Sequence, residues 1–333
     1  MHDAQILNTI NAIIIEMQFV EQETYLLDWI PLEKLYWAGL AQNPKAIHLL
    51  ASNFDKIPKD YEFFLSLNPN AVPILDANPQ LINWNHISSN SNAMHIIESN
   101  LDKINWEYLS DNPSASHLFE GNIDKIDKSV MCRNPSAIKI IEKLEQDDID
   151  WDYLSENPSA IHILEKNLDG IDIDWNNLSK NPSAIHLLRE NPDFIDWKNL
   201  CENTSPEAID LLREYPDNIV WDSLCDSDNP HAVKLFEENP DILRIGGTID
   251  FNTNDDSEIW AQVYVKRLWI DLSKNPHAIH LLEANLDKVD WGNLSLNPNA
   301  IHLLEANQDK IDWYNLSTNP AIFDFNKYNV VLK

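Results

Sequence analysis

A phrase that recurs about every 22 residues constrains this chain more than any other feature. Residues 295–307 read SLNPNAIHLLEAN, and residues 273–285, 22 positions earlier, read SKNPHAIHLLEAN. Most steps are 22 to 25 residues long, but one step, from Asn229 to Asn275, is 46. A period of this size is typical of solenoids, in which each unit buries its apolar face against its neighbours. The first Asn of the phrase recurs at Asn43, Asn68, Asn90, Asn112, Asn134, Asn157, Asn181, Asn229, Asn275, Asn297 and Asn319, with Ser205 in the equivalent place.

Each repeat reads as two short helices. The Asn of Asn-Pro is a favourable N-cap, and Pro suits the first helical position. The second Asn of the phrase, as in Asn285 and Asn307, is expected in the left-handed conformation that ends a helix. A second short helix begins at the Asp of Ile-Asp-Trp, another favourable N-cap. The sequence therefore predicts an all-α fold, an α-solenoid of about twelve short helix-turn-helix repeats.

Helical periodicity separates buried from exposed positions. The Ala, Ile and two Leu of the phrase share one face, which we expect to be buried with the repeat Trp and the apolar residue three positions after it. The residue after Ile falls on the opposite face and is predicted to be exposed. That position holds His48, His95, His117, His162, His186, His280 and His302.

The repeat pattern also divides the chain. Residues 5–20 are rich in apolar residues, so residues 1–27 are predicted to be an N-terminal helical cap. Repeats fill 28–244 and 266–322, and the long step between them contains an irregular acidic insertion at 245–265. Residues 323–333 are interpreted as a C-terminal tail or cap.

The charge balance limits the partners. With 24 Lys and Arg against 54 Asp and Glu, the net charge is −30, which disfavours nucleic acid and anionic membranes and permits a basic protein partner. No segment has the roughly 18 consecutive apolar residues of a membrane span, and the N-terminus lacks the basic region of a signal peptide. We therefore expect an intracellular protein that binds protein partners, and its oligomeric state stays open.

The phrases NPNAIHLLEAN and DKIDWYNLS resemble the Asn-Pro/Trp repeat proteins of giant DNA viruses. The resemblance covers roughly residues 28–322, although Glu62 and Lys128 replace the repeat Trp. It implies a solenoid of undefined biochemical role, located in the host cytoplasm or in the virion.

No catalytic, metal or cofactor site is predicted. Successive helix layers are about 10 Å apart, whereas the ligands of one zinc ion lie near 2 Å from the metal, so the His row cannot form a first shell. Cys132, Cys201 and Cys225 all occupy a position that is Ser in most repeats, which favours a small packed site over a reactive thiol. Residues 250–261 lack the Gly and the final Glu of a calcium loop.

The candidate binding site is the insertion. Trp260 lies outside the repeat position, beside Asp255, Asp256 and Glu258, and exposed aromatic residues often anchor interfaces. The alternative is a degenerate repeat in which Trp260 packs on Val263 and Leu268. The row of exposed His side chains is a second candidate contact surface: His162, His186, His280 and His302.

Three functions remain open. The first is a non-catalytic scaffold for protein–protein interaction, the second a structural component of a virion or assembly, and the third an acidic decoy for a basic nucleic-acid-binding protein.

Overall fold

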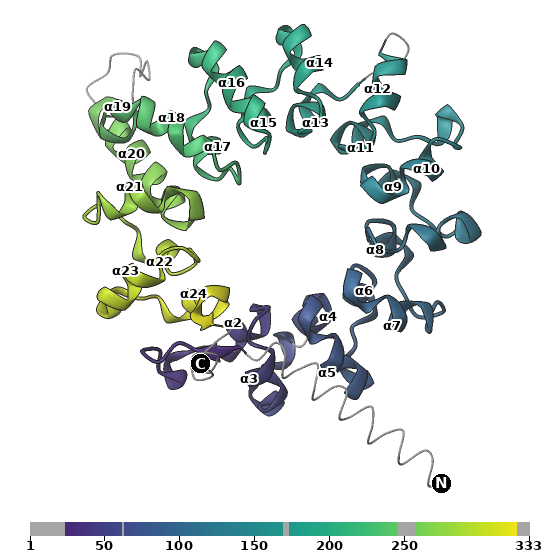
Figure 1. Cartoon of the computed structure of the whole chain (residues 1–333), viewed down its shortest axis with the longest axis horizontal. Coiled ribbons are helices and arrows are strands. Elements are labelled where there is room, and N and C mark those ends of the chain that lie inside the picture. Colours follow the sequence, from purple (N-terminus) through teal and green to yellow (C-terminus); the bar gives the residue numbers. More distant parts are fainter. Residues whose placement is uncertain (1–23, 62, 169–172, 246–256, 325–333) are drawn as a thin grey trace, which may run out of the picture. The chain divides into compact units, whose positions relative to one another are not determined.

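The protein is mostly helical in the computed structural model, which describes residues 24–61, 63–168, 173–245 and 257–324 (Figure 1). One helix of each repeat contains the Trp position or, for α4, begins directly after it, and we call these the Trp helices. They are α2 (Trp37–Gln42), α4 (Phe63–Leu67), α6 (Trp84–Ser88), α8 (Trp106–Ser110), α9 (Lys128–Arg133), α11 (Trp151–Glu156), α13 (Trp175–Lys180), α15 (Trp197–Cys201), α17 (Trp221–Cys225), α20 (Ser257–Lys274), α22 (Trp291–Leu294) and α24 (Trp313–Thr318).

The other helix of each repeat follows the Asn-Pro pair, and we call these the Asn-Pro helices. They are α3 (Ile47–Ala51), α5 (Val72–Ala77), α7 (Met94–Glu98), α10 (Ile138–Ile141), α12 (Ile161–Asn167), α14 (Ile185–Glu190), α16 (Pro206–Glu214), α18 (Ala232–Glu238), α21 (Ile279–Glu283) and α23 (Ile301–Ala306). One repeat has the 3₁₀ turns η7 (Ser116–Leu118) and η8 (Glu120–Asn122) instead, and α19 (Pro240–Ile245) is additional. These helices and turns confirm the predicted two-helix repeat.

Short 3₁₀ turns join many of these helices. They are η1 (Leu32–Lys34), η2 (Phe54–Lys56), η3 (Lys59–Tyr61), η4 (Pro69–Ala71), η5 (Pro79–Leu81), η6 (Ser91–Ala93), η9 (Pro135–Ala137), η10 (Gln146–Asp148), η11 (Pro192–Phe194), η12 (Pro216–Asn218), η13 (Pro276–Ala278), η14 (Gln308–Lys310) and η15 (Pro320–Ile322). The Asn of Asn-Pro often caps such a turn: the Asn68 side chain accepts a hydrogen bond from the N–H of Asn70, and α5 begins only at Val72.

The second Asn of the phrase ends its helix in a way that the sequence analysis did not predict. Asn307 has φ −135° and ψ 50°, so its backbone is not left-handed. Its side-chain amide instead donates to the carbonyl of Leu303, at 2.9 Å, and Asn285 donates in the same way to Leu281. The expected left-handed cap is therefore wrong at Asn307, because a side-chain donor satisfies a last-turn carbonyl without a positive φ.

The core lies between the two kinds of helix and between neighbouring repeats. The apolar residue three positions after the repeat Trp is at most 1% exposed in every repeat, from Leu40 to Leu316. The Ala of the Asn-Pro phrase is equally buried, from Ala46 to Ala300. Buried side-chain nitrogen and oxygen atoms of the described residues all have hydrogen-bond partners, as polar groups in a well-packed interior require.

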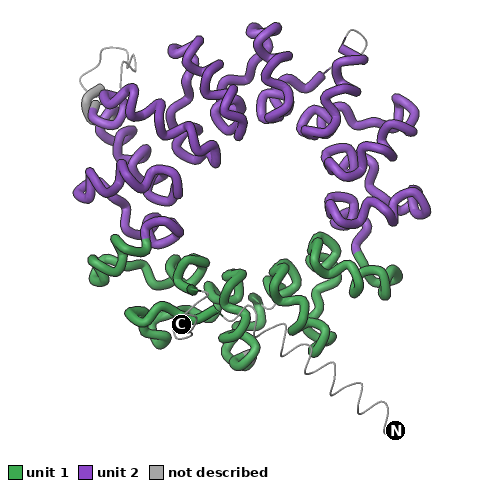
Figure 2. The backbone as a smooth tube through the Cα atoms, in the orientation of Figure 1, with its two compact units in different colours: residues 1–104, 301–333 green, residues 105–300 purple. Residues whose placement is uncertain are grey.

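The chain divides into two compact units, shown in green and purple in Figure 2. Unit 2 comprises Asn105–Ala300, and within it the Trp helices α9, α11, α13, α15 and α17 pack in chain order. Unit 1 combines Met1–Ile104 with Ile301–Lys333. Its first and last Trp helices, α2 and α24, pack against each other although they are distant in sequence.

Two short strands accompany that contact in unit 1. Strand β1 (Tyr25–Leu26) pairs antiparallel with β2 (Phe323–Asp324), and Tyr25 lies opposite Asp324. Residues 24–27 were expected to end a helical cap, but Tyr25 and Leu26 form a strand. The strand that pairs with it, Phe323–Asp324, is the beginning of the expected C-terminal tail. Residues 1–23 and 325–333 of the expected caps lie outside the described residues.

The structure also corrects part of the predicted insertion. Residues 257–265 are helical, because α20 runs without a break from Ser257 into the repeat Trp, Trp269, and on to Lys274. Residues 246–256 lie outside the described part of the chain. Val263 is 54% exposed whereas Leu268 is fully buried, so Val263 is not the core contact that the degenerate-repeat alternative required.

Candidate functional site

The Asn of Asn-Pro joins each repeat to the one before it. The Asn181 side-chain amide donates to the carbonyls of Ser155 and Asn157, at 2.9 and 3.1 Å, while its oxygen accepts the N–H of Ser183. Asn134 and Asn297 make the same pair of backward bonds. Asn203 does so too, which corrects the placement of Ser205 in this position: Ser205 caps α16 instead. The side chains of these Asn residues are fully engaged in hydrogen bonds between repeats, so they are not available to a partner.

The small residue at the end of the Trp helix forms a second link. The Ser179 hydroxyl donates to the carbonyl of Trp175 at 2.7 Å and accepts the N–H of Asp196, in the next repeat, at 3.0 Å. Cys132 and Cys201 occupy the same position, where they are fully buried. Burial raises the pKa of the Cys132 thiol to about 11 and that of Cys201 to about 12. At neutral pH these thiols stay protonated, so they are poor nucleophiles.

Most repeat Trp side chains are half-buried, which differs from the predicted core position. Trp84, Trp106 and Trp175 are all of this kind, whereas Trp269 is only 3% exposed. A Lys 19 residues further on covers the indole in several repeats: the Lys103 ammonium lies 4.9 Å from the centroid of Trp84, and Lys125 lies 5.0 Å from Trp106. The indole is therefore sandwiched between the repeat core and a cation of the next repeat.

Five of the seven His in the row are exposed, as predicted, whereas His48 and His162 are half-buried. Several members of the row pair with acids of the preceding repeat. The His162 ring lies 2.8 Å from the carboxylate of Glu142, His186 lies 2.7 Å from Glu165, and His280 lies 2.6 Å from Glu237. His302 occupies the equivalent exposed position of α23. The row thus belongs to the repeat-to-repeat contacts, and a partner would have to compete with these acids for it.

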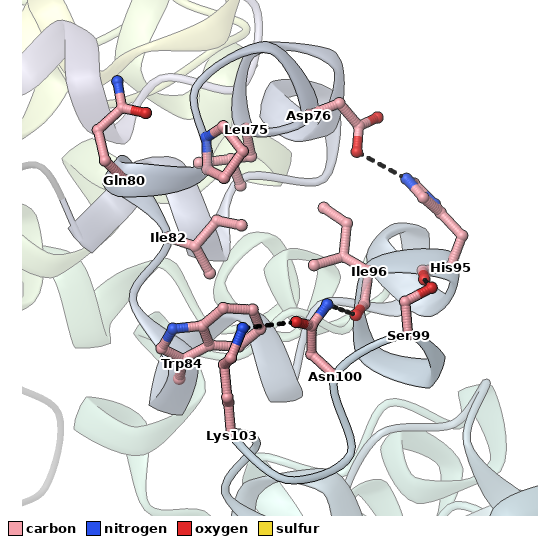
Figure 3. A pocket seen from close by; sticks show the side chains of 11 residues that line it. Leu75, Asp76, Gln80, Ile82, Trp84, His95, Ile96, Ser99, Asn100 and Lys103 are labelled. Atoms are coloured by element: carbon pink, nitrogen blue, oxygen red, sulfur yellow. Dashed lines mark hydrogen bonds and ion pairs between the residues drawn. The ribbon is translucent and has the colours of Figure 1, made fainter.

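A pocket of about 540 Å³ lies between two neighbouring Asn-Pro helices of unit 1, α5 and α7 (Figure 3). Leu75, Ile82, Trp84 and Ile96 supply apolar lining. Leu75 and Ile96 are buried, whereas Ile82 and Trp84 are half-buried and reachable. The pocket therefore offers an apolar surface to a group that enters from solvent.

Polar side chains form the rim of this pocket (Figure 3). The His95 ring nitrogen lies within hydrogen-bond distance of the Asp76 carboxylate, at 2.8 Å, and the Lys103 ammonium donates to the side chain of Asn100, also at 2.8 Å. Ser99, His95 and Asp76 are the residue types of a catalytic triad, but the Ser99 hydroxyl donates to the backbone carbonyl of His95 and not to its ring. The rim can orient a bound group, and it has no hydroxyl hydrogen-bonded to a base.

The insertion residues singled out from the sequence are only partly placed. The backbone of Glu258 and Trp260 belongs to the first turn of α20, whereas Asp255 and Asp256 lie outside the described residues. Sequence reasoning missed the pocket, although the repeat Trp and the Lys 19 residues later were visible in the pattern. In the described segments, no cluster of three or more His, Cys, Asp or Glu is placed to hold a metal ion. None of the helices described there has both the length and the apolarity to cross a bilayer.

Comparison with protein-family models found no match, and comparisons with curated proteins and with solved structures found none either.

Proposed function

We propose that this chain is a non-catalytic scaffold for protein–protein interaction, and that the pocket between α5 and α7 receives an apolar side chain of its partner. The observation that carries the proposal is the combination of a reachable apolar lining with a polar rim. Such a combination is typical of the pockets that hold interface anchors. The net charge of −30 favours a basic partner.

The repeat architecture supports this proposal from another side. Asn, Ser and Trp positions are committed to contacts between repeats, while the Asn-Pro helices keep exposed positions that differ between repeats. Binding at Trp84 would also compete with Lys103 for the ring face. The viral origin and the cytoplasmic location are proposed on the sequence resemblance alone.

The test is to fill the pocket and follow partner binding. Ser99 is exposed at the end of α7 and lines the pocket, so Ser99→Trp should block it without disturbing the core. Ala284→Trp is the matched control, because Ala284 is the equivalent exposed residue at the end of α21. Proteins captured from infected cells by the parent chain are identified, and each affinity is then measured with the purified chain.

The expected result is a loss of at least about tenfold in affinity with Ser99→Trp, equal to 1.4 kcal/mol or more, and no loss with Ala284→Trp. Equal affinity of both variants for every captured partner would exclude the pocket. A complex held by charge alone, as in the decoy alternative, would weaken steeply with salt in all three proteins.

A further inference from the structure

The contact between α2 and α24 in unit 1, which we call the seam (residues 24–45 and 313–324), has the same chemistry as a contact between successive repeats. The Asn43 side-chain amide donates to the carbonyls of Ser317 and Asn319, at 3.1 and 2.9 Å. Asn181 bonds its preceding repeat through the same two positions. At the seam, the last repeat therefore stands in the place of the repeat before the first.

Further contacts at the seam follow the same rule. The N–H of Tyr36 donates to the Ser317 hydroxyl at 2.8 Å, and the Lys34 ammonium lies 4.6 Å from the centroid of Trp313. The approach is close at Gly39, where an added Cβ would lie 2.6 Å from the Cβ of Ser317. The fit is thus specific to a Gly on one side and a small residue on the other.

The seam differs from a contact between successive repeats because its two sides are far apart in the sequence. Most residues bonded by the Asn ladder in unit 2 are 22 to 26 positions apart, as for Asn134 and Asn181, and Asn275, which follows the long step, bonds acceptors 48 and 50 positions away. Asn43 and its acceptors are 274 and 276 positions apart. Its two surfaces are also different from each other, one from α2 and one from α24. An interface of two different complementary surfaces on one molecule is heterologous, and copies can exchange it.

An opened seam would expose groups that are buried in the closed chain. Asn43, Leu40 and Leu316 are fully buried, and Phe323 is 3% exposed. The α2 side of the seam is complementary to the α24 side, and every copy of the chain carries both sides. We propose that the seam is a self-association surface, at which the last repeat of one copy docks on the first repeat of a second copy. This goes beyond the proposed function, because the pocket takes no part in it.

Complementation between two variants tests the exchange. Gly39→Leu spoils the α2 surface and leaves the α24 surface intact, and Ser317→Leu does the reverse. Neither variant alone has a matched pair of surfaces, but a mixture has one. We expect each variant to be monomeric by light scattering and an equimolar mixture to contain a species of twice that mass. Gly121→Leu is the control for adding a Leu at an exposed Gly, because a Cβ at Gly121 meets nothing within 4 Å.

A covalent lock gives a second measurement if a variant fails to fold. Tyr25 and Asp324 lie directly opposite in the antiparallel pair, so Tyr25→Cys with Asp324→Cys places two thiols across the seam. Tagged and untagged copies are mixed, warmed and captured through the tag. Oxidation should lower the capture of the untagged chain at least tenfold, and reduction should restore it. Capture that is unaffected by the lock, or absent without it, would overturn the proposal, as would a mixture of folded variants that stays monomeric.

Discussion

Replacing one ladder Asn in the middle of unit 2 should strongly destabilise the fold. Asn181 is 1% exposed, and its side chain makes three hydrogen bonds: two to the carbonyls of Ser155 and Asn157, and one from the N–H of Ser183. The Asn157 carbonyl also accepts the N–H of Ala160 and would stay paired. The Ser155 carbonyl and the Ser183 N–H would therefore be left without the partner that Asn181 provides, at about 1–3 kcal/mol for each group that is buried. We expect Asn181→Ala to lower the free energy of unfolding by about 2–4 kcal/mol.

Urea unfolding followed by circular dichroism measures this loss. Asn176→Ala is the matched control, because Asn176 is an exposed Asn of the same repeat whose backbone N–H, not its side chain, bonds Asp174. Asn181→Asp keeps the acceptor for Ser183 but points a carboxylate at two carbonyls. Its folded pKa should be raised, so its deficit should grow as pH rises above about 3.9, the unfolded value of Asp. A loss below about 1 kcal/mol for Asn181→Ala, or equal losses for it and the control, would refute the ladder as the joint between repeats.

Three further outcomes are expected. Cys201 should not react with a thiol reagent at pH 8 in the folded protein, because burial raises its pKa to about 12, and should react once urea unfolds the chain. Trp175→Ala should be less destabilising than Leu178→Ala, for which a fully buried Leu predicts about 2–5 kcal/mol in urea unfolding, since Trp175 is half-buried. Glu238→Gln should lower the free energy of unfolding by less than about 1 kcal/mol, because the ion pair between Glu238 and Arg213 is exposed. This ion pair lowers the pKa of Glu238. Its contribution to stability should therefore be present at pH 7 and disappear as pH falls below about 4.3, the unfolded value of Glu.

Much of the fold could be predicted because local signals agreed within each repeat. Asn, Pro and the apolar spacing specify two helices and their faces, and the structure confirms these faces at Leu178 and His186. The left-handed cap predicted at Asn307 was wrong because Asn can end a helix either through a left-handed backbone or through its side-chain amide, and the local sequence is the same in both cases. The repeat Trp was predicted to be buried because large apolar residues usually lie in the core. Most of these Trp are instead half-buried, and a Lys side chain covers the exposed ring face in several repeats.

The pocket and the seam could not be predicted, because both depend on which surfaces meet. No local pattern tells that Asn43 bonds Ser317 and Asn319, since Asn43 reads like every other ladder Asn. The pocket forms where Ile82 and Trp84 stay reachable between two helices, which is a matter of spacing between repeats. The acidic composition of residues 245–265 predicts an irregular loop, whereas α20 extends the repeat helix through residues 257–265.

The ladder has a consequence for how such a chain can grow. Asn134, Asn181 and Asn297 recognise only main-chain carbonyls of the preceding unit, and these are present whatever side chains that unit carries. The ladder bonds therefore place no demand on the side chains of the preceding unit, so a duplicated unit can form them with its new neighbour without a compensating mutation. The extra residues between Asn203 and Pro206 are accommodated while Asn203 keeps both backward bonds. Gene duplication could lengthen this array one unit at a time, leaving the exposed positions of each copy free to diverge.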